Sequence, residues 1–302
     1  MRIIDCFEAP QRADVSPSVL PVSFEIFPPK GDLPVEEARS MAEKLAPLDP
    51  AFVSVTYSAG GSGNSGKTVD VARMAKDEFG LTVMAHLTCA GATRAEIADV
   101  LCAMRAAGIE NVLALRGDMA AGITQGELAH ASDLIPLAVE AGFCVGAAAY
   151  PEGHIDCFDA QENIRHLKLK QDAGASFFVT QLFFDNDFAL RFLDDARRAG
   201  VTVPITFGIM PFMSKAQISR MVFMCGASLP SPVVKLLARY EDDPASLRAA
   251  GIEYAARQLV GLAEAGVDGL HVYTMNKPDV AAAAMAAVRQ AGFGAGRDAA
   301  GA

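Results

Sequence analysis

Basic residues are scarce in this chain of 302 residues. It has 26 Lys and Arg against 36 Asp and Glu, which gives a formal net charge of −10 at pH 7. Because nucleic acids are bound through many cationic side chains, this balance argues against a nucleic-acid-binding protein. An anionic small molecule is still allowed, since a local basic site can lie on an acidic surface.

The sequence also lacks the residue spacing of a metal or redox motif. None of the six cysteines forms a C-x-x-C pair, so neither a zinc site nor a disulfide framework is indicated. His86 and His154 have no third ligand at a helpful spacing, and we therefore predict no metal. Reduced, mostly buried thiols are expected, as in a cytoplasmic protein.

Long hydrophobic runs are absent as well. No stretch of about 20 consecutive apolar residues could span a bilayer, and we expect no membrane association. Residues 1–21 carry acidic side chains and no long apolar run, which argues against a signal peptide and favours a cytoplasmic location. Apolar residues nevertheless make up 51% of the chain, enough for a large core.

What the chain does contain is a regular alternation. Short runs of β-branched and aromatic residues alternate with longer, alanine-rich amphipathic runs, a pattern typical of a parallel sheet covered by helices. Eight such units favour closure into a barrel, because barrels of this kind need about 250 residues. We therefore predict an α/β protein with the (β/α)8 TIM barrel fold. The expected strands span residues 22–27, 52–56, 82–87, 111–115, 144–150, 177–183, 203–208 and 269–274.

The rival fold is an open, doubly wound sheet, which usually carries a glycine-rich fingerprint directly after a strand. The glycine- and serine-rich loop expected at 60–66 lacks that spacing, so the barrel ranks first. We expect a single catalytic domain over residues 1–302, with an N-terminal extension at 1–20 and a disordered tail at 292–302.

Two local features of the helices can also be predicted. Thr93 and Glu96 have the spacing of a capping box, which fixes the start of the third helix. A break near Gly251 is expected in the long helix over 245–265.

Polar residues gather where the expected strands end. In such a barrel the active site lies at the C-terminal ends of the strands. One polar residue at a strand end is most simply a satisfied structural group, but seven strands with polar ends predict a site. The residues in question are Glu25, Thr56, Tyr57, His86, Arg116, Asp118, Tyr150, His154, Gln181, Tyr273 and Lys277.

Glu25 is the most telling of these residues. Strand alternation places it with Ser23 on one face, and Phe24 and Ile26 on the other. Burial on the inward face favours the neutral acid, which suits a general acid. The alternative is a buried ion pair with Arg or Lys.

Asp118 follows Arg116 and Gly117 on a turn after the fourth strand. Gly117 would permit close approach of the backbone to a ligand. The structural alternative for this turn is a simple ion pair between Arg116 and Asp118.

Several short blocks, in order, resemble the methylenetetrahydrofolate reductase family. The resemblance extends from about residue 22 to residue 291. The blocks are Val-Ser-Phe-Glu-Ile-Phe-Pro-Pro-Lys at 22–30, Phe-Val-Ser-Val-Thr-Tyr at 52–57, His-Leu-Thr-Cys at 86–89, Leu-Ala-Leu-Arg-Gly-Asp at 113–118, Ala-Ala-Tyr-Pro-Glu at 148–152, Asp-Ala-Gly-Ala at 172–175, Thr-Gln-Leu-Phe-Phe-Asp at 180–185 and Tyr-Thr-Met-Asn-Lys at 273–277.

The resemblance implies a flavoprotein oxidoreductase of one-carbon metabolism and methionine biosynthesis. It implies that an FAD-containing barrel reduces 5,10-methylenetetrahydrofolate to 5-methyltetrahydrofolate, with hydride passing through the flavin N5. Glu25 would be the acid that helps to open the methylene bridge. Asp118 and Gln181 would contact the pterin, and Tyr273 and Lys277 would lie near the tail of the folate.

The same resemblance implies a set of FAD-binding residues. Arg and Lys suit a pyrophosphate, and Tyr150 offers a flat surface. The set comprises Thr56, Tyr57, His86, Leu115, Arg116, Gly117, Asp118, His130, Ala131, Ala148, Tyr150, His154, Asn163, His166 and Lys170.

Some positions depart from the family pattern, and they motivate alternatives. Asn163 stands where the family often has aspartate, and His166 and Leu169 replace Asn and Arg. One alternative is therefore a flavin-independent folate reductase that takes hydride directly from NAD(P)H. Another is a subunit that binds folate or a partner within a larger methyl-transfer complex.

The electron donor implied by the resemblance is NAD(P)H or a partner electron-transfer protein of the iron–sulfur type. The segment 212–215 lacks the aromatic residue that packs on the nicotinamide donor in some family members. A homo-oligomer is expected, because members of the family are often oligomeric.

Overall fold

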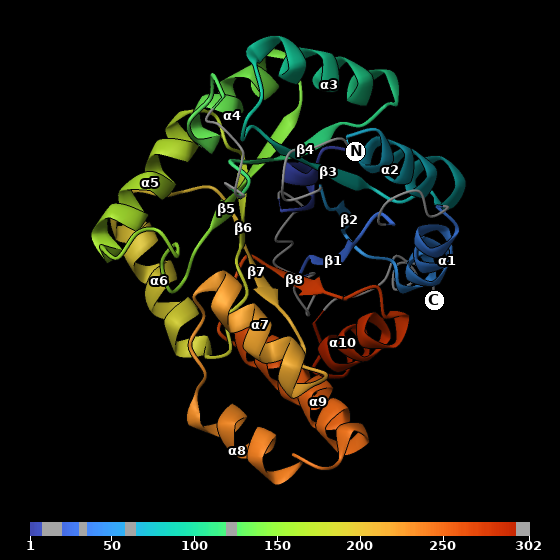
Figure 1. Cartoon of the computed structure of the whole chain (residues 1–302), viewed down its shortest axis with the longest axis vertical. Helices are drawn as coiled ribbons and strands as arrows, with labels where there is room; N and C mark the ends of the chain where they lie inside the picture. Colours follow the sequence, from blue (N-terminus) through green and yellow to red (C-terminus); the bar gives the residue numbers. More distant parts are fainter. Residues whose placement is uncertain (8–19, 30–34, 58–64, 119–125, 294–302) are drawn as a thin grey trace, which may run out of the picture.

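A computed structural model describes residues 1–7, 20–29, 35–57, 65–118 and 126–293. Eight parallel strands of this part of the chain form a closed barrel in the order β1 to β8, as the ring of strands in Figure 1 shows. No helix in the described ranges is long and apolar enough to cross a membrane.

The helices lie outside the strands and cover the barrel (Figure 1). The elements in chain order are η1 (Ile3–Cys6), β1 (Val22–Ile26), α1 (Glu36–Leu45), η2 (Ala46–Leu48), β2 (Phe52–Val55), α2 (Ser65–Phe79), β3 (Val83–Thr88), α3 (Arg94–Ala106), β4 (Asn111–Leu115), α4 (Ala131–Glu140), β5 (Cys144–Ala149), α5 (Ala160–Asp172), β6 (Phe177–Thr180), α6 (Asn186–Arg198), β7 (Ile205–Ile209), α7 (Lys215–Cys225), α8 (Ser231–Arg239), α9 (Pro244–Glu264), β8 (Gly269–Tyr273) and α10 (Pro278–Gln290).

The predicted (β/α)8 TIM barrel is therefore confirmed. The capping box is confirmed too, because Thr93 Oγ1 accepts from the Glu96 amide at 3.2 Å and Glu96 Oε2 accepts from the Thr93 amide at 2.8 Å. Of the loop expected at 60–66, residues 60–64 lie outside the described residues, while 65 and 66 already belong to α2.

The break expected near Gly251 is wrong. Helix α9 runs without interruption from Pro244 to Glu264. A Cβ atom on Gly251 would lie 1.7 Å from the carbonyl oxygen of Phe212. This glycine therefore serves close packing of the helix against the segment after β7, and not a change of helix direction.

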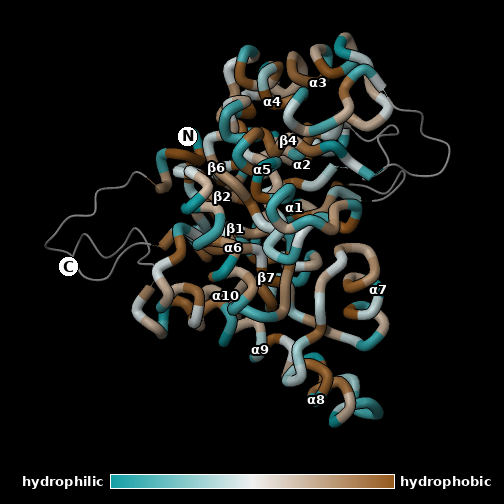
Figure 2. Tube along the Cα trace, turned by 90° about the vertical axis from the view of Figure 1, so that its left-hand side faces the viewer, coloured by the Kyte–Doolittle hydropathy of each residue, from teal (hydrophilic) through white to brown (hydrophobic). Residues whose placement is uncertain are grey.

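The described residues form three buried apolar clusters: the barrel wall separates two of them, and the third contains Phe184 and Phe212. The layer between strands and helices holds Phe24 and Ile26, while a smaller cluster inside the barrel holds Phe52 and Phe177. The apolar strands at the centre and the more polar outer helices can be followed in Figure 2.

The N-terminal end of the barrel is closed by the start of the chain. Ile3 is fully buried in the cluster inside the barrel. Its amide donates to Asn111 Oδ1 at 2.8 Å, and Asn111 Nδ2 donates to the Val83 carbonyl at 3.0 Å. Part of the expected extension at 1–20 is thus a plug, and a ligand of the barrel has to approach the other end.

Candidate active site

Glu25 lies on the inner face of β1, as alternation predicts. Its residue is 7% exposed, whereas Phe24 and Ile26 are fully buried between strands and helices. No described Arg or Lys forms an ion pair with it, and the titratable side chains that lie within 4 Å of its carboxylate are those of two histidines. The ion-pair alternative for this acid is therefore not found among the described residues.

Two histidine–serine hydrogen bonds lie on either side of the Glu25 carboxyl group. His86 Nε2 lies 3.8 Å from Glu25 Oε2 and 2.7 Å from Ser54 Oγ. His271 Nε2 lies 3.9 Å from the same oxygen, and its Nδ1 is 2.8 Å from Ser23 Oγ.

Burial dominates the electrostatics of His86. It lowers the pKa of the imidazole from 6.5 to about 4, although the Glu25 charge acts in the opposite direction. His86 is therefore uncharged near neutral pH and gives Glu25 no counter-charge.

The strand that carries Glu25 is held by the turn after β8. Thr274 Oγ1 donates to the Glu25 carbonyl at 2.6 Å. Asn276 accepts from the Phe27 amide at 2.9 Å and donates to the Phe27 carbonyl at 3.1 Å. Met275 and Asn276 have φ values of 54° and 52°, so the turn needs left-handed backbone, which asparagine tolerates better than most residues.

Tyr273 bridges two strands at the same rim. Its hydroxyl donates to the Thr180 carbonyl at 2.6 Å, and its backbone pairs in register with Glu25. The ring crosses Gly208, where an added Cβ would lie 2.6 Å from Tyr273 Cε2. Gln181, next to Thr180, folds back so that its Oε1 accepts from the Leu182 amide at 2.9 Å. Lys277 lies further out, as the N-cap residue of α10.

A cavity of about 330 Å³ lies beside this rim, against β4 and β5. Many of the predicted cofactor residues line it together. These are Leu115, Arg116, His130, Ala131, Ala148, Tyr150, His154, Asn163, His166 and Lys170. Ser132, Asp156, Cys157 and Phe192 also line it and were not predicted from the sequence.

Lys170 provides a positive charge in this cavity without a carboxylate partner among the described residues. Its Nζ donates to the Ala148 carbonyl at 2.8 Å and lies 5.3 Å from the centre of the Tyr150 ring. Burial lowers the pKa of Lys170 from 10.5 to about 8 and raises that of Tyr150 to about 12. An anionic group of a ligand would supply the countercharge that this lysine lacks.

Arg116 provides the second cationic group. Its Nη2 donates to Asp156 Oδ2 at 2.9 Å. The expected alternative, an ion pair with Asp118, is wrong, because the partner comes from the loop after β5. Asp118 itself is exposed.

Asn163 lines the cavity, but the polar atoms of its side chain form hydrogen bonds with the loop after β5. Asn163 accepts from the His154 amide at 2.8 Å and donates to the Cys157 and Asp159 carbonyls at 3.1 and 2.9 Å. His166 pairs with Glu162 on the surface of α5 at 3.0 Å.

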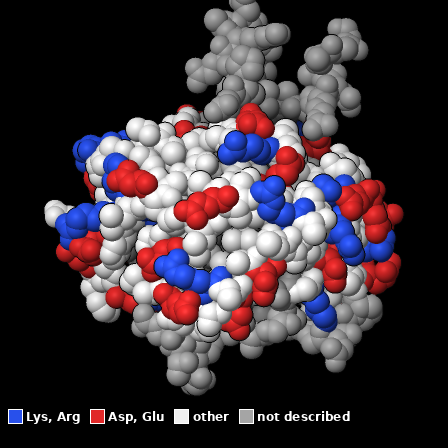
Figure 3. Space-filling view, turned by 90° about the horizontal axis from the view of Figure 1, so that it is seen from above, with Lys and Arg blue, Asp and Glu red and all other residues white. Residues whose placement is uncertain are grey.

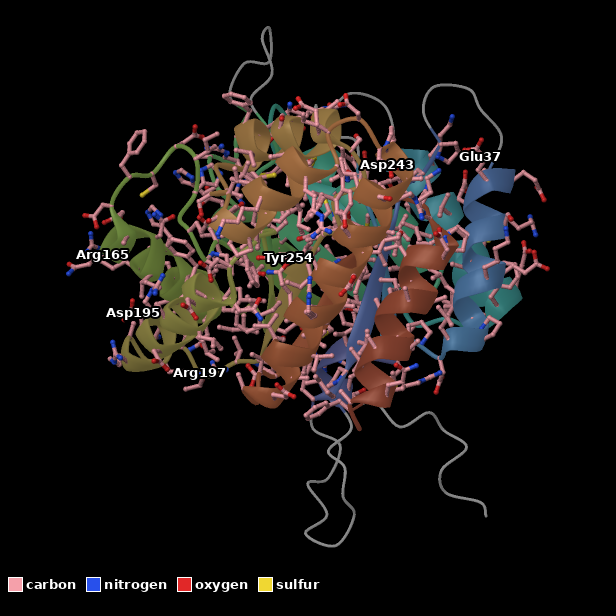
Figure 4. The ribbon with its side chains drawn as sticks, turned by 90° about the horizontal axis from the view of Figure 1, so that it is seen from below. Glu37, Arg165, Asp195, Arg197, Asp243 and Tyr254 are labelled. Carbon is pink, nitrogen blue, oxygen red and sulfur yellow. The ribbon has the colours of Figure 1, made fainter. Side chains whose placement is uncertain are left out.

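Apart from Lys170 and His166, no described side chain of α5 that lines the cavity can carry a charge. Leu169 lines the cavity and is 55% exposed. Arg165 lies at the outer edge of α5, as Figure 4 shows. The cations of this cavity are therefore those of Arg116 and Lys170, apart from any charge on its histidines.

The N-terminus of α4 also borders the cavity, through Ala131 and Ser132. Asp133 Oδ2 accepts from the amides of Ala129 and His130 at 3.0 and 2.9 Å, which fixes where the helix begins. Free amide groups at such a helix start carry partial positive charge and favour anions.

The remaining predicted cofactor residues are not among those lining the cavity. Thr56 and Tyr57 follow β2, and His86 points into the barrel. Gly117 has a φ of 86°, and a Cβ there would lie 2.9 Å from the Thr88 side chain. Local packing and backbone conformation are thus enough to explain why position 117 is a glycine, whether or not a ligand binds there.

The surface around the barrel is mixed in charge. Figure 3 shows acidic and basic side chains interspersed on one face, without a single large patch of one sign among the described residues of that face. The positive charges of the cavity are therefore a local feature of an acidic molecule.

Comparisons with known proteins agree with this arrangement. The family model of methylenetetrahydrofolate reductase matches residues 12–289. The 5,10-methylenetetrahydrofolate reductase of Escherichia coli K12 is 35% identical over 281 residues, which cover 91% of this chain and 94% of that protein. Methylenetetrahydrofolate reductase (NADH) 1 of Arabidopsis thaliana is 35% identical over 271 residues, which cover 84% of this chain and 46% of that protein. The chain thus spans about half the length of the plant relative.

A solved structure shares the fold. It is an uncharacterized protein from Clostridium thermocellum that binds two copies of 5-methyl-5,6,7,8-tetrahydrofolic acid. The two structures superpose with a TM-score of 0.65 at 15% identity, over 89% of this chain and 94% of the other. With the family model matched over most of the sequence, the chain belongs to the methylenetetrahydrofolate reductase family.

Proposed function

We propose that this chain is a flavin-dependent oxidoreductase that reduces 5,10-methylenetetrahydrofolate to 5-methyltetrahydrofolate, or runs the reverse reaction. The observation that carries the proposal is Glu25, a buried acid that pairs with no Arg or Lys among the described residues, at the end of the barrel where ligands bind in this fold. Family membership supplies the substrate class.

The cavity suits FAD in its chemistry. Arg116, Lys170 and the start of α4 would hold the pyrophosphate, and Tyr150 would offer a flat surface. Bound FAD would supply a carrier that accepts and donates hydride. The proposed electron donor is NAD(P)H or a partner electron-transfer protein.

Glu25 would hold a proton and deliver it to the folate nitrogen that leaves as the methylene bridge opens. The surrounding groups favour this role, because His86 is uncharged and His271 is fully buried beside it. Asp118 and Gln181 would bind the pterin, and Tyr273 and Lys277 would orient the remainder of the folate. Because the Tyr273 hydroxyl is engaged with Thr180, its contribution would be a fixed wall more than a free donor.

The first test is the binding of FAD, read without turnover. Cys157 lines the cavity, whereas Cys102 is exposed on α3 and serves as an internal control. Bound FAD should slow alkylation of Cys157 by iodoacetamide and leave Cys102 unchanged, as mass spectrometry would show. A protein that is colourless, gains no protection from FAD and does not turn over 5-methyltetrahydrofolate with menadione would refute the proposal.

The electron donor can be identified on the same protein. Anaerobic addition of NADH, NADPH or reduced ferredoxin should bleach the flavin absorbance with the physiological donor only. Failure of both nucleotides with success of ferredoxin would assign a partner protein as the donor.

A second candidate is a flavin-independent folate reductase that uses NAD(P)H directly. The observation that favours it is the cavity wall at α5, where Asn163 is bonded to its own loop and Leu169 offers no charge. NAD(P)H-linked folate reduction by protein that binds no FAD would select this candidate. Absence of any turnover together with tight folate binding would instead indicate a binding subunit.

A further inference from the structure

Asp156 stands out in the cavity that we assign to FAD. It is the one carboxylate among the described residues that line the cavity. Negative charge at this place is unexpected, because the proposed ligand carries a pyrophosphate of the same sign. The contacts of Asp156 explain how the two can be reconciled.

The Asp156 carboxylate forms an ion pair with the guanidinium group of Arg116, which the pyrophosphate would need as its own partner. Arg116 Nη2 donates to Asp156 Oδ2 at 2.9 Å, and Arg116 Nε donates to the Gly117 carbonyl at 3.3 Å. Lys170, in contrast, donates only to a neutral carbonyl. One cation of the cavity is therefore already neutralised, and the other is not.

The Arg116–Asp156 ion pair is exposed enough for a ligand phosphate to replace the carboxylate. The side chain of Asp156 is 63% exposed and that of Arg116 is 31% exposed, so water can solvate the carboxylate when it leaves. The Asp156 amide donates to His154 Nδ1 at 3.1 Å, which anchors the backbone. Rotation of one side chain is then enough to free Arg116.

We infer that the Asp156 carboxylate is an internal stand-in for the ligand's phosphate on Arg116, and that it sets the affinity of the cavity for phosphorylated flavins. Binding of FAD exchanges one anion on Arg116 for another, and the released carboxylate then repels the bound phosphates. The inference rests on the proposed function, because it assumes that the cavity receives FAD.

The test compares Asp156→Asn with Asp172→Asn, a control on the same loop–helix unit that does not line the cavity. Dissociation constants are measured by flavin fluorescence at low salt for riboflavin, FMN and FAD. Asp156→Asn should bind FAD about three- to tenfold more tightly than the wild type, with a smaller gain for FMN. Riboflavin, which has no phosphate, should bind equally to all three proteins.

The outcomes separate the two proposals. If the wild type binds FAD and Asp156→Asn binds it equally or more weakly, the inference falls and the proposed function stands. An equal gain for riboflavin would also overturn the inference, since the cause would then be steric. If no protein of the set binds FAD, the proposed function and the inference fall together.

Two further measurements guard against misinterpretation. The gain for FAD should shrink as the ionic strength rises, because exposed charges are screened by salt. Asp156→Ala should reproduce the gain, which would show that the new amide of the first variant is not its source. A gain that is insensitive to salt, or that is confined to the asparagine variant, would contradict an electrostatic exchange.

Discussion

At the scale of single residues, the feature that matters most for Glu25 is that its described neighbours include histidines but no Arg or Lys. The nearby imidazole of His86 is kept uncharged by burial, and His271 is fully enclosed. Among the described residues, no Arg or Lys therefore pairs with the Glu25 carboxyl group.

The first prediction follows for Glu25→Gln. Reduction of methylenetetrahydrofolate should fall by about 100-fold or more, because general acid catalysis contributes on the order of 10² to 10⁴. Reduction of bound flavin by its donor should be unchanged, and stopped-flow absorbance measures both steps. Glu37→Gln on the outer surface of α1 (Figure 4) is the control. Equal folate rates in Glu25→Gln and wild type would remove the acid role.

The second prediction concerns Lys170 and pH. Its pKa is lowered to about 8, so the free protein loses this charge as the pH rises through that value. A bound phosphate stabilises the charged form, and the affinity for FAD should therefore weaken by about three- to tenfold between pH 7 and pH 9.5. Lys170→Arg, which stays charged throughout, should show a flat profile. Equal slopes in both proteins would mean that Lys170 does not face the phosphate.

A residue's place in the site can be predicted from the sequence when it follows from the pattern of neighbouring residues in the same strand. Alternation along β1 is enough to place Glu25 inside, and the ends of β4 and β5 bring Arg116 and Tyr150 to one cavity. The partner of Arg116 could not be inferred in the same way. Asp118 is two positions away in the chain, yet Asp156 on another loop is the residue in contact.

At the scale of elements, Gly251 shows the same limit of local reasoning. A glycine inside a helix pattern usually signals weak helix, and a break was the natural expectation. In the structure the helix is intact and the missing side chain makes room for the Phe212 carbonyl. Glycine is needed here because of a contact with Phe212, 39 positions earlier in the chain, and the hydrophobic periodicity of the helix contains no information about that contact.

The third prediction is that Gly251→Ala destabilises the protein in spite of the better helix propensity of alanine. The propensity gain is about 1 kcal/mol, whereas overpacking costs about 3 kcal/mol at its upper end, which applies here because the added Cβ would lie 1.7 Å from a backbone oxygen. Urea unfolding followed by circular dichroism measures the difference. Gly66→Ala in α2, where a Cβ would have nothing within 4 Å, is the matched control and should not destabilise. A more stable Gly251→Ala protein would contradict the packing explanation.

At the scale of the whole molecule, the barrel must join the first strand to the last. Strands β1 and β8 pair in parallel, with Glu25 opposite Tyr273. Beyond the strands, Asn276 extends the closure through its two hydrogen bonds to Phe27. The closure of the fold and the placement of Glu25 therefore depend on the same turn.

The final prediction tests this link with Asn276→Gly, which keeps the left-handed backbone accessible and removes both side-chain bonds. Stability should fall by about 1–3 kcal/mol, because two partly buried backbone groups lose their partners. Folate turnover should fall more than FAD affinity, since the turn holds the Glu25 strand whereas the cavity lies against β4 and β5. Asn276→Asp retains the acceptor for the Phe27 amide and should lie between glycine and wild type in both measurements. If FAD affinity and turnover decline in parallel, the turn supports the barrel as a whole, and the separate positioning of Glu25 by this turn is wrong.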